Sequence, residues 1–407
     1  MFEALERLPV SEMTMRHAAC RQRLTEVAPE AGGLAVFSRL GIYYLTGTWG
    51  NGVLWLPQSG EPVFLCRKGI ERARLESPLA AMFPFRSYAD LPGLLAEAGS
   101  PFSPVVAAEM SGLTWALSDL LRARVKDVRF VPGDAALAKA MAVKSDWELR
   151  KMRLCGARHD KALQELLPTM LHPGMTERET AHKAWEAFFS LGHMGHMRMN
   201  AHGEEIFLGH VAAGDSGNYP SVFNGPVGLR GEHPAQALMG CAGHVWRPGE
   251  PLTMDIGFVL EGYHTDKTQV YWAGPASGIP DVVRKAHDFC IEVQARLAEG
   301  LRPGGIPSEL YAMAMDMAKK AGLQEGFMGL GGNKVNFLGH GIGLAIDGWP
   351  VIAKGFDEPL REGMTLALEP KHGIPGVGMV GVENTFEVTA SGGVCLTGTR
   401  YDMLCVP

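Results

Sequence analysis

An internal repeat constrains the fold of this chain more than any other sequence feature. Leu-His-Pro-Gly at residues 171–174 recurs as Leu-Arg-Pro-Gly at residues 301–304, and each is followed five residues later by a glutamate. At the same offset of 130 residues, Phe-Leu-Gly-His at 207–210 recurs at 337–340. One such match is expected by chance in a long chain, but several in the same order indicate a duplication.

The repeat continues downstream at a shorter offset. Arg247 precedes Asp255 by eight residues, and Arg361 precedes Glu369 by eight. The offset has fallen to 114, so the first copy carries 16 extra residues. These matches predict a duplicated helix–helix–strand–hairpin unit, and two such units would form one domain with an approximate twofold axis.

The region before the repeat has a different organisation. Short apolar strands alternate with helical segments, which is typical of a small α/β domain. Gln-Ser-Gly at residues 58–60 separates two apolar runs and predicts a hairpin. Ser145 and Glu148 predict a capping box at the start of a helix that we expect to reach Leu167. We therefore predict one domain over residues 1–144 and a second over residues 145–407.

Charge, hydropathy and cysteine content argue against several classes of protein. The 38 Lys and Arg against 44 Asp and Glu leave a net charge of −6, so nucleic acid is not an expected partner. The sequence contains no run of about 18 apolar residues, so no membrane span is expected. The acidic first residues do not resemble a secretory signal. The seven cysteines form no close pairs, so we expect no disulfide framework and a reducing, cytoplasmic compartment.

Each half of the repeat carries acidic residues at matching places. Asp255 lies in a predicted strand, and Asp266 lies in the strand that returns after a turn. If that turn is centred between Leu260 and Glu261, the two aspartates lie directly opposite each other on one face of a hairpin. Their Cβ atoms would then be about 4.5–5.5 Å apart. A lone aspartate in a hairpin is usually a solvated turn residue, but the duplication favours a shared site.

The second half supplies Glu369 at a strand end and Glu383 after a glycine-rich return. Four carboxylates in a partly buried site would repel one another and raise each other's pKa. Two divalent ions would balance their charge, and His340 would add an imidazole ligand. Oxygen-rich ligation with one nitrogen suits Mn, Fe(II), Co or Zn. Two ions about 3.5–4 Å apart can deprotonate a water molecule and polarise a carbonyl.

At these residues the sequence resembles the creatinase, prolidase and aminopeptidase-P family. Tyr-Tyr-Leu-Thr-Gly at 43–47 and Val-Lys-Ser at 143–145 with Glu148 match landmarks of its N-terminal domain and of the junction, so the resemblance covers nearly the whole chain. It implies an α+β fold: a C-terminal pita-bread domain with a pseudo-twofold duplication, preceded by a smaller α/β creatinase-type N-terminal domain. It also implies a homodimer.

The resemblance implies a dinuclear metal site with five ligands. By this likeness Asp255 would chelate one ion, whereas Asp266 and Glu383 would bridge both ions, and His340 and Glu369 would complete the site. Glu369 would also handle the proton of the water that becomes a metal-bridging hydroxide and attacks the scissile carbonyl.

The sequence departs from the prolyl peptidases of this family at three positions. Asp347 stands where they usually carry a second histidine, and Gly381 stands where they usually carry an arginine. After the second aspartate they tend to read Thr-Arg, whereas this chain has Thr268 and Gln269. Each change removes a positive or hydrogen-bonding group near the site, so a proline peptide is left open as the substrate.

The resemblance also implies a histidine upstream of the first aspartate that touches the substrate. His233 and His244 are both candidates in the glycine- and proline-rich insertion, and we favour His233 as the catalytic partner of Glu369. His210, the repeat partner of His340, is predicted to line the substrate pocket, with a purely structural role as the alternative. His244 and Asp347 complete the predicted substrate-binding residues.

A second group of histidines stands out after the first helix of the repeat. It comprises His193, His196 and His202, with methionines interspersed. Their irregular spacing favours a solvated loop or a pocket rim over a second metal site.

These features lead to one hypothesis and two alternatives. The leading hypothesis is a hydrolase of the Xaa-Pro aminopeptidase or prolidase type that cleaves a small peptide or amide bond near a chain end with two divalent ions. The first alternative is an enzyme of the same fold acting on a small metabolite, such as a guanidino compound, a cyclic amidine or a sulfonium acid. The second is a catalytically silent binding protein.

Overall fold

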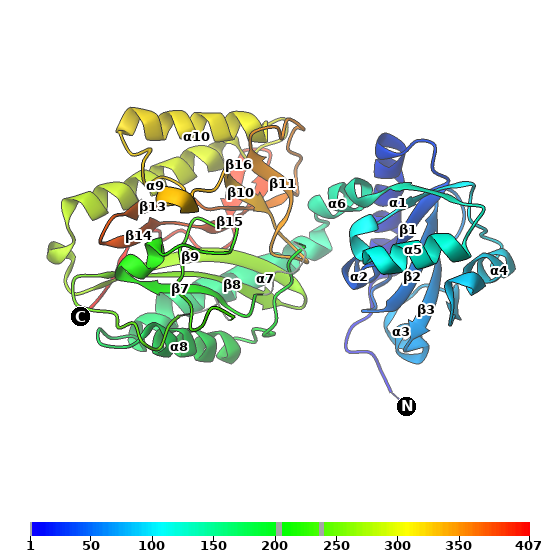
Figure 1. Ribbon diagram of the computed structural model, residues 1–407, viewed down its shortest axis with the longest axis horizontal. Helices are drawn as coiled ribbons and strands as arrows, with labels where there is room; N and C mark the ends of the chain where they lie inside the picture. Colours follow the sequence, from blue (N-terminus) through cyan, green and yellow to red (C-terminus); the bar gives the residue numbers. More distant parts are fainter. Residues whose placement is uncertain (1, 201–205, 236–239) are drawn as a thin grey trace. The chain divides into compact units, whose positions relative to one another are not determined.

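The computed structural model describes residues 2–200, 206–235 and 240–407. The chain forms two compact units, Met1–Met141 and Ala142–Pro407 (Figure 1).

The first unit is built on one six-stranded sheet in the order β4-β3-β2-β1-β5-β6. Strands β1, β2 and β3 are antiparallel, and the outer strands join in parallel. The predicted hairpin at 58–60 is confirmed, because it connects β2 to β3. The strands are β1 Gly33–Val36, β2 Asn51–Pro57, β3 Val63–Lys68, β4 Met82–Pro84, β5 Val105–Ala108 and β6 Arg129–Pro132. The helices are α1 Val10–Val27, α2 Arg39–Thr46, α3 Ile70–Glu76, α4 Leu91–Glu97, α5 Trp115–Arg124 and α6 Asp134–Ala142.

The first half of the second unit packs two helices against a four-stranded sheet, β17-β9-β8-β7. The Ser145 capping box starts α7 as predicted, since the Ser145 hydroxyl accepts from the Glu148 N–H. The α-helical part ends at Lys161 and continues as a π-helical turn over Ala162–Leu166, so the helical path reaches the predicted end near Leu167. The elements are α7 Asp146–Lys161, α8 Glu177–Ser190, β7 Gly209–Ala213, β8 Pro251–Leu260, β9 Tyr263–Ala273 and β17 Leu404–Val406.

The second half repeats this arrangement around a five-stranded sheet, β11-β10-β12-β15-β16, beside the two-stranded pair β13-β14. Figure 1 shows α8 and the pair α9 and α10 on opposite outer sides, with the strands between them. The duplicated helix–helix–strand–hairpin unit is therefore confirmed. The elements are α9 Asp281–Gly300, α10 Pro307–Ala321, β10 Phe337–Gly341, β11 Gly348–Ala353, β12 Thr365–Leu368, β13 Lys371–Ile374, β14 Gly378–Gly381, β15 Asn384–Thr389 and β16 Gly392–Cys395.

Two apolar cores hold the halves in shape. The first core joins α7 and α8 to the four-stranded sheet through residues such as Cys155, Phe188 and Phe258. The second joins α9 and α10 to the five-stranded sheet through Val293, Leu338 and others. Since each sheet turns one face to its own helices, polar side chains on the other face are free to gather between the halves.

The β8–β9 hairpin differs from the predicted register by two residues. Its turn is Glu261-Gly262, with φ of 50° and 84°, as a two-residue turn of type I′ requires. Asp255 therefore lies opposite Thr268, and Asp266 lies opposite Gly257, so the predicted direct pairing of the aspartates was wrong. Because the shift is an even number of residues, both aspartates keep the same face of the sheet.

Candidate metal centre

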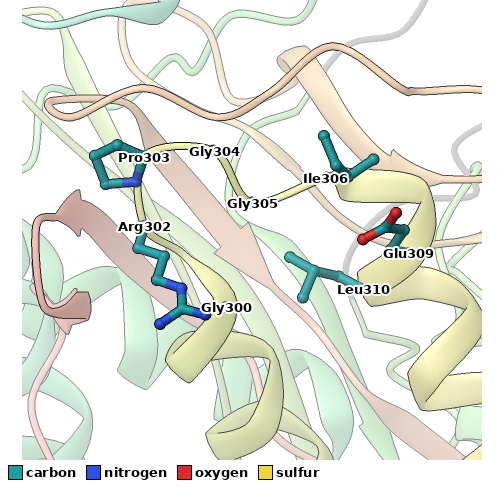
Figure 2. Close-up of a pocket in the computed structure, with 8 residues that line it drawn as sticks. All are labelled: Gly300, Arg302, Pro303, Gly304, Gly305, Ile306, Glu309 and Leu310. Atoms are coloured by element: carbon teal, nitrogen blue, oxygen red, sulfur yellow. The ribbon is translucent and has the colours of Figure 1, made fainter.

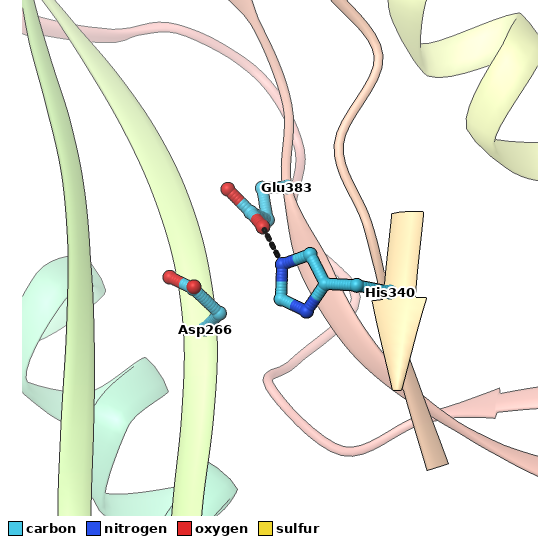
Figure 3. A group of neighbouring side chains, drawn as sticks. All are labelled: Asp266, His340 and Glu383. Carbon is cyan, nitrogen blue, oxygen red and sulfur yellow. Dashed lines mark ion pairs between the residues drawn. The ribbon is translucent and has the colours of Figure 1, made fainter. Parts of the chain in front are cut away.

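Three predicted ligands from separate strands converge in the second unit. Asp266 lies in β9, His340 in β10, and Glu383 just before β15. One ligand atom from each lies within 4.8 Å of the other two, and Figure 3 shows the side chains pointing toward one another. His340 Nε2 is 3.8 Å from Glu383 Oε1. Two carboxylates and one imidazole at this spacing suit a divalent cation.

The other two predicted ligands lie in the same cluster. Glu369, at the end of β12, is buried and places Oε1 3.6 Å from His340 Nε2. Asp255, in β8, accepts a hydrogen bond of 2.6 Å at Oδ1 from the Thr268 hydroxyl. The Thr268 hydroxyl also donates to Glu383 Oε2 at 3.2 Å, and the Thr268 backbone N–H donates to the Glu383 carbonyl oxygen at 3.1 Å. The structure thus brings all five predicted residues together from both halves.

A lysine that the sequence analysis did not single out lies inside this cluster. The Lys371 side chain is 0% exposed, and its Nζ is 2.6 Å from Glu383 Oε2. The same Nζ is 3.3 Å from Glu369 Oε2 and 3.3 Å from Asp255 Oδ1. The available signal was its position, two residues after a predicted ligand and immediately after Pro370.

The electrostatics show that one lysine does not neutralise the cluster. Burial, followed by the charge of Asp255, raises the pKa of Asp266 to about 7. Burial and the neighbouring carboxylates also raise the pKa of Glu369 and of Glu383, the latter to well above its usual range. Burial acts the same way on Asp255, but there the charge of Lys371 and hydrogen bonds outweigh it and lower the pKa. The donor set therefore fits further positive charge beside Asp266.

The three positions that depart from the prolyl peptidases have other partners. Asp347 Oδ1 accepts from the Asn200 N–H at 2.6 Å, and the Asp347 carbonyl accepts from the Asn200 side chain. The Gln269 amide bonds to Gln164 and to the Asp402 carbonyl. A Cβ on Gly381 would lie 2.5 Å from the Pro370 carbonyl oxygen, so this backbone has no room for a side chain.

The predicted substrate-contacting histidines lie in different environments. His210 is buried in β7 opposite Asp255, and its ring packs edge-on against Phe223. Burial lowers the pKa of His210. His244 Nε2 lies 2.9 Å from the Ala213 carbonyl oxygen, tying the insertion to β7. His233 is exposed, and its Nδ1 accepts from the Ala235 N–H at 3.1 Å.

The members of the second group of histidines differ in their exposure to solvent. His193 is buried and packs its ring against Phe188, Phe258 and Trp185, so a solvated position was wrong for it, whereas the alternative of a pocket rim stays a prediction. An aromatic cluster can hold a neutral imidazole, and burial lowers the pKa of His193 to about 4. His196 is exposed as expected. His202 lies outside the described residues.

A hollow elsewhere in the second unit contains none of these groups. It has a volume of about 570 Å³ and lies at the connection between α9 and α10. Figure 2 shows its lining, in which Arg302 and Glu309 are the charged residues. With no titratable cluster at its wall, it is not a candidate active site.

The chain matches known families over most of its length. Residues 150–390 match the model of metallopeptidase family M24, and residues 16–141 match the creatinase/prolidase N-terminal domain. These two matches define the class, a creatinase-type N-terminal domain followed by a peptidase-type hydrolase domain. The chain belongs to metallopeptidase family M24. Membership implies divalent metal ions, and it confirms the predicted family and enzyme class.

Relatives and solved structures agree with this assignment. A probable dipeptidase PepE of Mycobacterium bovis is 29% identical over 87% of this chain and 85% of its own length. A Xaa-Pro dipeptidase of Pyrococcus furiosus is 31% identical over 38% of this chain and 42% of its own length. The structure of an X-Pro aminopeptidase from Thermotoga maritima superposes with a TM-score of 0.75 at 20% identity, covering 95% of this chain and 99% of that one.

The structural likeness confirms the predicted fold class, α+β with a C-terminal pita-bread domain and a creatinase-type N-terminal domain. None of the helices among the described residues combines the length and the apolar character that crossing a bilayer requires.

Proposed function

We propose that this protein is a metal-dependent dipeptidase or aminopeptidase of the Xaa-Pro type, cleaving one peptide bond at the end of a small peptide. One observation carries the proposal: Asp266, His340 and Glu383 place ligand atoms within 4.8 Å of one another. Family membership and the dipeptidase and Xaa-Pro dipeptidase names of the relatives support the reaction class.

The side chains that would hold divalent metal are the five that the sequence analysis selected. They are Asp255, Asp266, His340, Glu369 and Glu383. Divalent ions bound there supply Lewis acidity toward a carbonyl and lower the pKa of a water molecule. Two ions with a bridging hydroxide, drawn from Mn, Co, Fe or Zn, remain the prediction from the family resemblance.

Glu369 is the proposed general base. Its carboxylate is buried and lies between His340 Nε2 and Lys371 Nζ, so its position is fixed. A fixed, desolvated carboxylate accepts a proton from an attacking water more readily than a hydrated one. His233 and His244 stay predictions as substrate contacts, whereas His210 is supported as a wall of the site by its pairing with Asp255.

The remaining predictions concern the organisation of the whole protein. We propose residues 145–407 as the catalytic domain and residues 1–144 as the N-terminal domain. A homodimer is expected from the family resemblance, and the mass of the protein in solution tests it.

A small non-peptide substrate is the second candidate, and one observation favours it. Gly381 has no room for the arginine that prolyl peptidases usually carry, and the Asp347 carboxylate is bound to Asn200. Groups that would hold a proline dipeptide in those relatives are therefore missing here.

The test is a substrate panel on the purified, metal-loaded protein. We expect cleavage of a dipeptide or Xaa-Pro substrate that stops when a chelator removes the metal and returns when Mn²⁺ is added. Turnover that survives complete metal removal would contradict the proposal. If no peptide in the panel is cleaved and a guanidino, amidine or sulfonium compound is turned over, the second candidate is favoured.

A further inference from the structure

We infer that the Lys371 ammonium permanently takes the place of one of the two cations expected in this centre, so that the protein binds a single divalent ion at Asp266, His340 and Glu383. The inference rests on the proposed function in one respect, the assignment of this cluster to divalent metal. It changes what the five ligands do, because one of them serves the lysine instead of an ion.

The carboxylate oxygens of Glu383 and Glu369 are divided between two cation positions. Glu383 gives Oε2 to Lys371 Nζ at 2.6 Å and turns Oε1 toward His340 Nε2 at 3.8 Å. Glu369 does the same, with Oε2 3.3 Å from Lys371 Nζ and Oε1 3.6 Å from His340 Nε2. Two carboxylates that each serve two cation positions are the pattern of a binuclear centre. Here one position is filled by the ammonium.

Asp255 lies in contact with Lys371. Its Oδ1 is 3.3 Å from Lys371 Nζ and accepts from the Thr268 hydroxyl at 2.6 Å. It is not among the three residues whose ligand atoms converge for an ion. An ion bound to Asp255 and Glu383 would compete with the lysine for the same oxygens, since metal–oxygen bonds are only about 2.0–2.6 Å long.

Burial and charge hold the ammonium in this position. The Lys371 side chain is 0% exposed, so the ammonium cannot withdraw into solvent without rearranging β13. It supplies one positive charge to four carboxylates, of which Glu369 and Glu383 are buried, and this leaves an excess of negative charge that suits a divalent ion beside Asp266.

The experiment counts ions. Purified full-length protein is stripped with a chelator, dialysed against Mn²⁺ at increasing concentration, and analysed by mass spectrometry of the metal content and by electron paramagnetic resonance. We expect wild type to saturate at one Mn²⁺ per chain with the spectrum of an isolated ion. We expect Lys371→Met, which removes the charge and keeps much of the length, to saturate at two and to show a spin-coupled pair.

Two aspartate variants keep the inference falsifiable if Lys371→Met does not fold. Asp266→Asn should weaken Mn²⁺ binding by roughly 100-fold or more, whereas Asp255→Asn should still bind one ion with a much smaller change in affinity. Melting temperature and circular dichroism of each chelated variant check the fold.

Three outcomes overturn the inference: two ions in wild type, none in wild type, or a larger loss of affinity in Asp255→Asn than in Asp266→Asn. A different outcome contradicts the proposed function. If the protein binds one ion tightly but cleaves no peptide, the peptidase proposal is wrong while the role of Lys371 is supported.

Discussion

The two halves of the second unit share a plan, and they use it differently. In the first half, β8 and β9 form an uninterrupted antiparallel ladder from Pro251 to Trp272, closed by a two-residue turn. In the second half the corresponding path is broken into β12, β13, β14 and β15, with Pro370 directly after Glu369. The regular half holds two aspartates on one face of a rigid hairpin. The broken half turns its backbone inward, and this places two glutamates and a lysine in the centre.

The repeated histidines show the same contrast. His210 lies opposite Asp255 in β7 and packs on Phe223, whereas His340 lies opposite Ala367 and points at Glu369 and Glu383. Duplication thus fixes where a residue sits along a strand, but the local register decides whether it becomes a ligand. Substitutions in the two halves test this division of roles.

Removing a charge from the broken half should have the largest effect. Glu383→Gln should lower kcat/KM by about 1,000-fold or more, because Glu383 contacts His340, Lys371 and Thr268 at once. Peptidase kinetics and metal content measure the loss. Glu292→Gln, on the exposed side of α9, is the matched control and should retain wild-type activity. Equal activity in the two variants would contradict the assignment of the centre.

The paired histidines give the sharpest comparison between the halves. His340→Ala should lose roughly 100-fold in metal affinity, since it removes the one nitrogen ligand. His210→Ala should keep its metal and mainly raise KM, because its ring forms the wall beside Asp255. Metal titration and steady-state kinetics on both variants separate these outcomes. If His210→Ala lost its metal as well, the two halves would be functionally equivalent.

The ligands could be predicted from the sequence because their order along the chain depends on the duplication, which a single sequence displays. Asp255, Asp266, His340, Glu369 and Glu383 all lie in the cluster that the repeat predicted. The hairpin register was missed by two residues because Glu261-Gly262, rather than Leu260-Glu261, has the backbone freedom for a type I′ turn.

Lys371 could not be placed from the same pattern. A lysine in a strand is most often a solvated edge residue, and nothing in the spacing says that Pro370 ends β12 and redirects the chain. The direction of that side chain depends on the pairing of β13 with β14, where Lys371 lies opposite Gly381. This contact joins residues ten apart across an irregular return, and neither helical nor strand periodicity reports it.

The pH dependence of the metal-free protein tests the excess negative charge. The pKa of Asp266 is raised to about 7 from an ordinary value of 3.8, so between these values the folded protein binds more protons than the unfolded chain. This group therefore makes stability fall as pH rises from about 4 to about 7. Buried histidines such as His264 act in the opposite direction, so the informative quantity is the difference between variants.

We expect the metal-free Asp266→Asn variant to gain stability relative to metal-free wild type as pH rises across that interval. Chemical unfolding at several pH values in the presence of chelator measures the difference. Saturating Mn²⁺ should reverse the order, because only wild type retains the ligand. A pH-independent difference between the two metal-free proteins would mean that the carboxylate of Asp266 is already balanced.

The smallest effects concern two glycines that shape the two returns. Gly262 has a φ of 84° in the regular turn, where an added Cβ meets only the end of Leu344 at 3.7 Å and a side-chain atom of Arg198 at 3.9 Å. Gly262→Ala should therefore lower the free energy of unfolding by about 1 kcal/mol through backbone strain alone, and should leave metal binding unchanged.

Gly381 has a φ of 128° and an added Cβ would clash with Pro370, so Gly381→Ala should be about twice as destabilising and should also weaken metal binding. Urea unfolding and Mn²⁺ titration of the pair compare a turn that only closes a hairpin with a return that also positions Lys371. Equal effects on metal affinity would show that the broken half tolerates the same backbone changes as the regular one.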